Sequence, residues 1–248
     1  MKKTLLPLLL LTAFCHQSIQ ALEPAESALL EQAATQITTL FDRNFKVKMA
    51  SPELGKLLAD QVAVASKQMG MPVHINISYF NISNADGKQE CQVVLSKDTP
   101  MREMLEPQAN SLLQSSGISE MLCQATLLSL QNAGQLLLDK KDGFKVSRDS
   151  ASNCDYLNEE LQMPFAGATV QKVIVRIDKA SKSITNYVLE MQDQTALRVN
   201  LKMGTPKNAP DGQVCPHAIR VEHNLQVATK GIKVPQTINA KFAGYEFP

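Results

Sequence analysis

Cys215, His217 and His223 are the residues of this sequence whose types and spacing best suit a metal ion. All three numbers are odd, so a single unbroken strand would place the side chains on one face, as metal ligands require. Pro216 interrupts such a strand because proline has no backbone N–H to donate. Cys215 is also expected to form a disulfide. The sequence therefore predicts no metal site.

Motifs of common catalytic sites are absent from the sequence. It contains no Gly-x-Ser-x-Gly turn, no His-Glu-x-x-His pair, no Walker loop and no dinucleotide-binding glycine pattern. Cys-x-x-Cys is absent too, which argues against thiol oxidoreductase chemistry. The adjacent acids Glu159 and Glu160 flank a loop and are interpreted as solvated side chains. We expect no catalytic residue, no cofactor and no enzymatic activity.

The first 21 residues have the composition of a Sec signal peptide. Lys2 and Lys3 precede an apolar run from Leu5 to Phe14, and the segment ends at the small residue Ala21. We expect cleavage near Ala21 and a periplasmic or secreted protein. The apolar run is too short to span a bilayer, so an integral membrane protein is not expected.

The charge of the chain is close to zero. Its formal net charge is +1, and removal of residues 1–21 takes away two lysines and no acid, which leaves about −1. A nearly neutral protein has no electrostatic reason to bind nucleic acid, so no such partner is expected.

Four cysteines remain after the leader: Cys91, Cys123, Cys154 and Cys215. An even number in an exported protein favours two disulfides. Three connectivities are possible for four cysteines. We favour Cys91–Cys123 and Cys154–Cys215, because sequential pairing closes the shorter loops.

Helical patterns occupy two parts of the chain. Apolar residues recur at helical spacing over 25–43, and a second helix opens at Ser51-Pro52-Glu53 and ends near Gly70. Two more helices are predicted over 99–117 and 119–140, the last of them apolar on most sides. A hairpin is expected between these parts, over 73–96. Residues 22–248 are predicted to form a single α+β domain, with a helical N-terminal part (25–70), a helical insertion (99–140) and a β-meander (142–248).

The C-terminal part alternates between apolar and polar residues. Strands are predicted over 144–148, 168–178, 183–192, 195–203, 219–228 and 232–242, with 151–166 irregular. In the strand over 195–203, Leu197, Val199 and Leu201 share one face, opposite charged or polar neighbours. An antiparallel sheet that is dry on one side needs helices to cover that side. The predicted fold class is therefore α+β.

Two polar residues interrupt the apolar rows: His223 and Gln236. Either they are core groups hydrogen-bonded to the backbone, or the dry face lines a pocket in which a few polar groups orient a ligand.

Three stretches carry a resemblance to a known family: residues 173–179, 187–203 and 231–238. They resemble the superfamily of LolA-like periplasmic lipoprotein carriers and their lipid-binding relatives. The resemblance implies a curved half-barrel sheet whose apolar concave face is capped by helices and accepts acyl chains. The helices 100–116 and 119–139 would form the lid. The implied lining consists of Leu197, Val199, Leu201, Ile219, Val221, Leu225, Val234 and Ile238, with His223 and Gln236 as polar positions.

Two functions follow from these patterns. The first is a periplasmic binding protein that holds a lipid or lipidated ligand, such as a lipoprotein acyl chain, between sheet and helices. The second is a non-catalytic structural or interaction protein whose core is filled by its own side chains.

Overall fold

The computed structural model describes residues 22–68, 73–115, 119, 127, 129–165, 168–224, 228–229 and 232–248. The predicted signal peptide, Cys123 and Leu225 lie outside the described residues. Among the helices that the structure describes, none is long and apolar enough to cross a bilayer.

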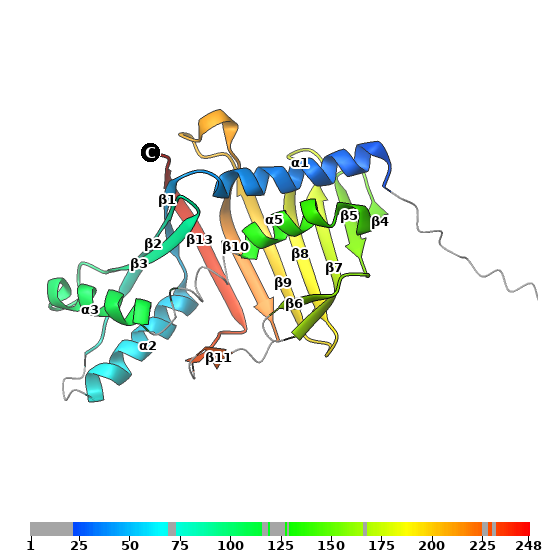
Figure 1. Ribbon diagram of the computed structural model, residues 1–248. Helices are drawn as coiled ribbons and strands as arrows, with labels where there is room; N and C mark the ends of the chain where they lie inside the picture. The colour runs from blue at the N-terminus through cyan, green and yellow to red at the C-terminus, as the bar shows by residue number, and fades with distance from the viewer. Residues whose placement is uncertain are drawn as a thin grey trace, which may run out of the picture.

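An antiparallel sheet of eleven strands forms the centre of the molecule (Figure 1). Its order is β3-β2-β1-β13-β10-β9-β8-β7-β5-β4, with β6 paired to β7, and it is open at β3 and β4. A separate pair, β11 and β12, completes the strands. The strands are β1 (Phe45–Ala50), β2 (Ile77–Ala85), β3 (Lys88–Leu95), β4 (Lys145–Asp149), β5 (Asn153–Asn158), β6 (Met163–Phe165), β7 (Ala168–Asp178), β8 (Ser183–Met191), β9 (Ala196–Gly204), β10 (Cys215–His223), β11 (Ala228–Thr229), β12 (Ile232–Lys233) and β13 (Thr237–Glu246).

The helices pack against the sheet in two groups. The described helices are α1 (Pro24–Phe41), α2 (Pro52–Gln68), α3 (Arg102–Ser115) and α5 (Ser129–Asp139), with short 3-10 turns η2 (Lys141–Gly143) and η3 (Pro210–Gly212). Figure 1 shows α1 and α5 side by side across one face of the sheet, and α2 and α3 at the end formed by β2 and β3. The predicted α+β fold class, a curved antiparallel sheet with helices on its apolar face, is confirmed.

Local sequence explains where the first two helices start. Pro24 occupies the first turn of α1, and Glu23 and Glu26 form a reciprocal capping box, in which the Glu26 carboxylate accepts the Glu23 backbone N–H at 2.9 Å. In α2, Pro52 again opens the helix and Glu53 lies in the first turn. Proline costs little there because the first N–H groups of a helix have no partner inside it.

The predicted one-sided sheet is confirmed in its central strands. On β9, Leu197, Val199 and Leu201 are buried while the residues between them are exposed. Strands β1 and β13 show the same alternation. The buried side chains belong to one hydrophobic core that also contains residues of α1, α2, α3 and α5. Burial of these side chains is the main force that holds the helices on the sheet.

The prediction that 151–166 is irregular is wrong. Residues 153–158 form β5, which pairs with β7 over its whole length, and 163–165 form β6. Strand β5 reads Asn-Cys-Asp-Tyr-Leu-Asn, so β-propensity is weak. Pairing compensates, because the Arg176 guanidinium on β7 donates to both Asp155 carboxylate oxygens, at 2.7 and 2.8 Å.

The predicted disulfide between Cys154 and Cys215 is also wrong. Both residues are buried free thiols. Cys154 lies on β5 and Cys215 on β10, and strands β7, β8 and β9 separate them in the sheet. Four strand spacings amount to about 19 Å, far beyond the ~7 Å between Cα atoms that a disulfide tolerates. The predicted Cys91–Cys123 pair involves Cys123, which lies outside the described residues.

Candidate ligand-binding face

The register of the sheet brings apolar side chains into one continuous row. The row contains Val175 (β7), Tyr187 (β8), Val199 (β9), Val221 (β10) and Ile238 (β13), each directly opposite its neighbour. All five are buried. Directly opposite residues of an antiparallel pair point to the same face, so the row crosses five strands, about 19 Å.

Two further rows flank this one, each two residues along the strands. One contains Leu201, Ile219 and Ala240. The other contains Leu189, Leu197 and His223. We call the inward-facing side chains of β8, β9, β10 and β13 in the three rows the central apolar face; they are Tyr187, Leu189, Leu197, Val199, Leu201, Ile219, Val221, Ile238 and Ala240, with His223 at its border.

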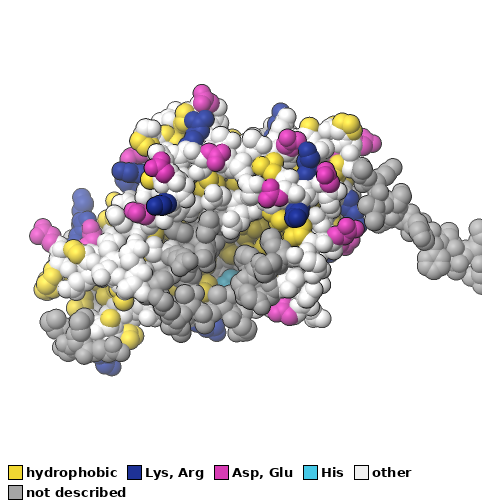
Figure 2. Space-filling view, in the orientation of Figure 1, with side chains coloured by type: hydrophobic (Ala, Val, Ile, Leu, Met, Phe, Trp, Pro, Cys, Tyr) yellow, Lys and Arg dark blue, Asp and Glu magenta, His cyan; other side chains and the backbone are white. Residues whose placement is uncertain are grey.

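The helices meet the sheet on either side of this face. Helix α1 packs against β7 and β8, and α2 packs against β2 and β13. Strands β9 and β10 lie between these two contacts. In the orientation of Figure 1, Figure 2 shows hydrophobic side chains and a histidine in the middle of this side of the molecule, below α1.

Helix α1 is attached to the sheet by hydrogen bonds along its length. The Tyr156 hydroxyl on β5 donates to the Glu26 carbonyl at 2.8 Å. The Gln213 amide, just before β10, donates to the Gln36 carbonyl at 3.0 Å. These bonds satisfy buried polar groups and fix α1 over the Cys215 end of β10.

Helix α2 is fixed at its first turn. The Glu53 carboxylate accepts the Asn239 side-chain amide at 2.6 Å and the Asn239 backbone N–H at 3.2 Å. Burial alone would raise the pKa of Glu53, but these hydrogen bonds outweigh it, so the pKa lies below its usual range.

Helix α5 lies on α1 through close apolar packing. A Cβ atom at Gly134 would be only 2.9 Å from Ile37 Cγ2, so only glycine permits this approach of the two helices. Gln131, one turn before Gly134 in α5, accepts a hydrogen bond from the Gln89 amide on β3 at 3.3 Å. Helix α5 is thus carried mainly by α1 rather than by the sheet.

The structure brings most of the predicted lining residues together. Leu197, Val199, Leu201, Ile219, Val221, Val234 and Ile238 are all buried, between 1% and 7% exposed. Leu225 lies outside the described residues.

The prediction that Gln236 belongs to the apolar face is wrong. Its side chain is exposed, in a bend between β12 and β13. Pro235 has no N–H to continue the ladder. The backbone of Gln236 bonds β10, because its carbonyl accepts the His223 N–H at 2.9 Å.

His223 is the polar residue that the structure does place on this face. It lies opposite Leu197 and is half-buried. One ring nitrogen, Nε2, is 2.9 Å from the Pro235 carbonyl oxygen. The other, Nδ1, is buried without a hydrogen-bond partner among the described residues.

Cys215, His217 and His223 do not converge. A bulge in the β9–β10 pairing falls between Pro216 and Ala218. Cys215 is fully buried, whereas His217 is exposed with its ring over Gly204. Burial raises the pKa of Cys215 to about 12, so its thiol is protonated at neutral pH. In the described part of the chain, no group of three or more His, Cys, Asp or Glu residues is arranged to hold a metal ion.

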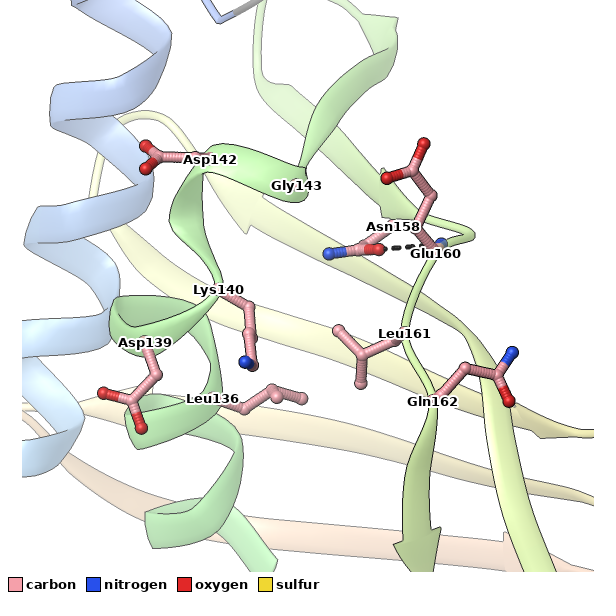
Figure 3. A pocket seen from close by; sticks show the side chains of 9 residues that line it. All are labelled: Leu136, Asp139, Lys140, Asp142, Gly143, Asn158, Glu160, Leu161 and Gln162. Atoms are coloured by element: carbon pink, nitrogen blue, oxygen red, sulfur yellow. Dashed lines mark hydrogen bonds between the residues drawn. The ribbon is translucent and has the colours of Figure 1, made fainter.

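Figure 3 shows a pocket of about 390 Å³ at a different place, between the end of α5 and the segment after β5. Leu136 and Leu161 face each other across it, and Lys140, Asp139 and Gln162 form its polar border. The Asn158 side-chain oxygen accepts the Glu160 backbone N–H at 3.0 Å. Glu159 forms an ion pair with Lys145, which lowers the pKa of Glu159. Both acids are exposed, as expected of solvated side chains.

The expected position of α3 as a lid over the central strands is wrong. Helix α3 lies along the edge strand β3 instead. Three side chains one helical turn apart bond its backbone: Glu106 accepts the Leu95 N–H at 2.9 Å, Asn110 accepts the Val93 N–H at 2.8 Å, and Gln114 donates to the Cys91 carbonyl at 3.0 Å. The spacing i, i+4, i+8 of these three polar residues is visible in the sequence. It predicts a contact with a strand backbone only when β3 is known to be an edge strand.

Comparison with known proteins gives two similar backbones. One is a LolA superfamily protein from Nitrosomonas europaea, with 11% identity and a TM-score of 0.37, covering 89% of this chain and 92% of that chain. The other is a putative outer membrane lipoprotein-sorting protein domain from Vibrio parahaemolyticus, with 8% identity and a TM-score of 0.33, covering 88% and 91%. No family model and no curated protein matches the sequence. The proposed function therefore rests on the geometry of the central apolar face.

Proposed function

We propose that this chain is an exported, non-catalytic binding protein that holds a lipid or a lipidated ligand on the central apolar face, beneath helices α1 and α5. Its place of action is the periplasm or the exterior of the cell. Binding is passive: an acyl chain replaces contacts between the helices and the sheet, and no bond of the ligand is made or broken.

One observation carries the proposal: the continuous apolar rows across β8, β9, β10 and β13. Their middle strands, β9 and β10, lie between β8, against which α1 packs, and β13, against which α2 packs. A filled β-sandwich would cover this interval with a second sheet, whereas here the described neighbours on either side of it are the helices α1 and α2. Each acyl methylene buried there would contribute about 0.8 kcal/mol.

A ligand can reach this face only if its cover moves, because the side chains of the face are buried. Helix α5 is the element best suited to move. Its contacts with α1 are apolar and pass through Gly134, while α1 is hydrogen-bonded to the sheet at Tyr156 and Gln213. Lid movements of this kind set the rates of uptake and release in many proteins.

The same burial supports a second candidate, a structural or interaction protein with a self-filled core. If the helices and the central apolar face satisfy each other fully, the face has no capacity for a ligand. The two candidates predict different effects on ligand binding and on stability when a larger side chain is introduced at the middle of the face.

Val221→Phe tests this difference. In a ligand site, the phenyl ring occupies the space of the acyl chain, so binding of a fluorescent fatty acid falls while the unfolding midpoint stays close to that of the wild type. In a filled core, overpacking costs about 1–3 kcal/mol of stability. The control Lys202→Phe is on the exposed side of β9 and should change neither.

Native mass spectrometry of the protein purified from the periplasm provides the direct observation. The proposal predicts a ligand-bound mass whose excess is released by organic extraction as acyl-containing species. A mass equal to the polypeptide alone, with no uptake of fluorescent fatty acid, would establish the self-filled core instead.

A further inference from the structure

The hydrogen bond of His223 to its partner fixes the position of one ring proton. A carbonyl oxygen accepts hydrogen bonds and donates none, so the 2.9 Å contact between Nε2 and the Pro235 oxygen requires the proton to be on Nε2. The neutral ring then carries a lone pair, not a hydrogen, on Nδ1. In the neutral ring, Nδ1 is therefore an acceptor.

The backbone holds this ring in place. The last register pair between β10 and β13 is Glu222 with Thr237. Beyond it, two successive carbonyls, those of Pro235 and Gln236, bond the ring and the N–H of His223. These two hydrogen bonds set the orientation of the ring, and neither of them involves Nδ1.

Nδ1 is buried and has no hydrogen-bond partner among the described residues. A buried acceptor without a donor lowers stability unless a ligand or water supplies the donor. His223 is the polar member of the row that includes Leu189 and Leu197. On β10, the His223 ring is therefore the hydrogen-bonding group closest to the apolar rows.

The ends of β10 differ in polarity and in cover. At the Cys215 end, α1 is attached through Gln213 and Gln36. His223 is at the opposite end, eight residue steps or about 26 Å away along the strand. A chain-like ligand on this face would therefore have its apolar end towards α1 and its polar end at His223.

We propose that Nδ1 of His223 accepts a hydrogen bond from the polar end of the bound lipid, and that the ligand is an acyl or alkyl chain ending in an N–H or O–H donor. Amides and alcohols meet this requirement. Deprotonated carboxylates and esters do not, because they offer Nδ1 no hydrogen. The inference rests on the proposed function and narrows its ligand class.

Four probes with the same eighteen-carbon chain test the inference: oleamide, oleyl alcohol, oleate and methyl oleate, titrated against wild-type protein at neutral pH. The two donors should bind about three- to tenfold more tightly than methyl oleate, the factor that corresponds to one neutral hydrogen bond. A synthetic peptide with an oleoylated N-terminus then separates free lipids from lipidated proteins as the source of the amide.

His223→Phe keeps a flat ring and removes the acceptor, so the preference for donors should disappear. His223→Gln supplies an amide oxygen and should restore part of it. His217→Phe, at the exposed histidine of the same strand, is the matched control and should leave the preference unchanged. Nitrogen-15 NMR of the imidazole reports the tautomer directly: Nε2 should carry the proton in the free protein, and the Nδ1 resonance should shift when oleamide is added.

The outcomes are distinguishable. Equal affinity for all four probes, or tightest binding of oleate with a protonated Nδ1, overturns the ligand class while leaving lipid binding intact. Failure of every probe to bind overturns the proposed function and the inference with it.

Discussion

Two helices cover this sheet in different ways. At one end, α3 lies along β3 and bonds its backbone through Glu106, Asn110 and Gln114, so the helix takes the place of a neighbouring strand. Over the middle, α5 lies on α1 through apolar contact at Gly134, with a single weak hydrogen bond from β3 to Gln131. Directional hydrogen bonds fix a helix in one position, whereas apolar contacts of similar area tolerate sliding and exchange of partners.

The difference indicates that the two parts of the fold have different roles. The end formed by α2, α3, β2 and β3 is a fixed support whose edge strand is protected against pairing with other chains. The central apolar face is the part in which a ligand can replace protein contacts.

The largest effect is expected for Phe80→Ala on β2. Phe80 is completely buried, and removal of its ring should lower the free energy of unfolding by about 3–5 kcal/mol, as measured by chemical denaturation. Tyr79→Ala is the control on the same strand, where the partly exposed ring faces Lys48. It should cost about 1 kcal/mol or less. Equal losses at both positions would mean that this end is not tightly packed.

Asn110→Ala tests the attachment of α3. It removes both the acceptor for the Val93 N–H and the donor to the Val93 carbonyl, at 2.8 and 3.0 Å. We expect a loss of about 1–3 kcal/mol of stability. Gln108→Ala on the exposed side of the helix should stay within about 0.5 kcal/mol. A neutral Asn110→Ala variant would contradict the rigid attachment.

Hydrogen exchange compares the two helices directly. Amides of α5 should exchange about tenfold faster than those of α3, which corresponds to one net hydrogen bond of local stability. Addition of an acyl ligand should slow exchange in α5 and leave α3 unchanged. If α3 is the faster of the two, the assignment of fixed and movable cover is reversed.

The smallest effect is expected for Glu53 as the pH falls. Its folded-state pKa is lowered, so its contribution to stability is fully present above the ordinary value of 4.5 and is lost as the pH drops through the lower folded value. The urea midpoints of wild type and Glu53→Gln should therefore differ at pH 6 and converge towards pH 3. A constant difference would show that the Asn239 contact does not depend on the carboxylate charge.

Local pattern was sufficient to predict the elements that bury one regular face. Leu197, Val199 and Leu201 alternate with polar residues, apolar residues recur at helical spacing over 25–43, and Pro52 marks a helix start, so these segments were predicted correctly. Strand β1 was missed although Phe45, Val47 and Met49 alternate as clearly. Its partners are β2 and the C-terminal β13, a neighbour almost two hundred residues away that no local pattern indicates.

The errors at the site have the same origin. Sequential pairing of Cys154 with Cys215 fails because the strand order separates them. Gln236 is exposed because the chain bends there before β13, and His223 gains its fixed ring from the carbonyls of Pro235 and Gln236. These features depend on which strands become neighbours, and sequence spacing does not report that.

Photo-crosslinking tests the central claim most directly. A fatty amide with a diazirine in its chain would be irradiated with the intact protein, and the labelled residues identified by peptide mass spectrometry. We predict labels at Val199, Val221 and their inward-facing neighbours on β9 and β10, lost on competition with unlabelled oleamide. Labels confined to the outward residues of these strands, or none that competitor removes, would contradict a ligand site on the central apolar face.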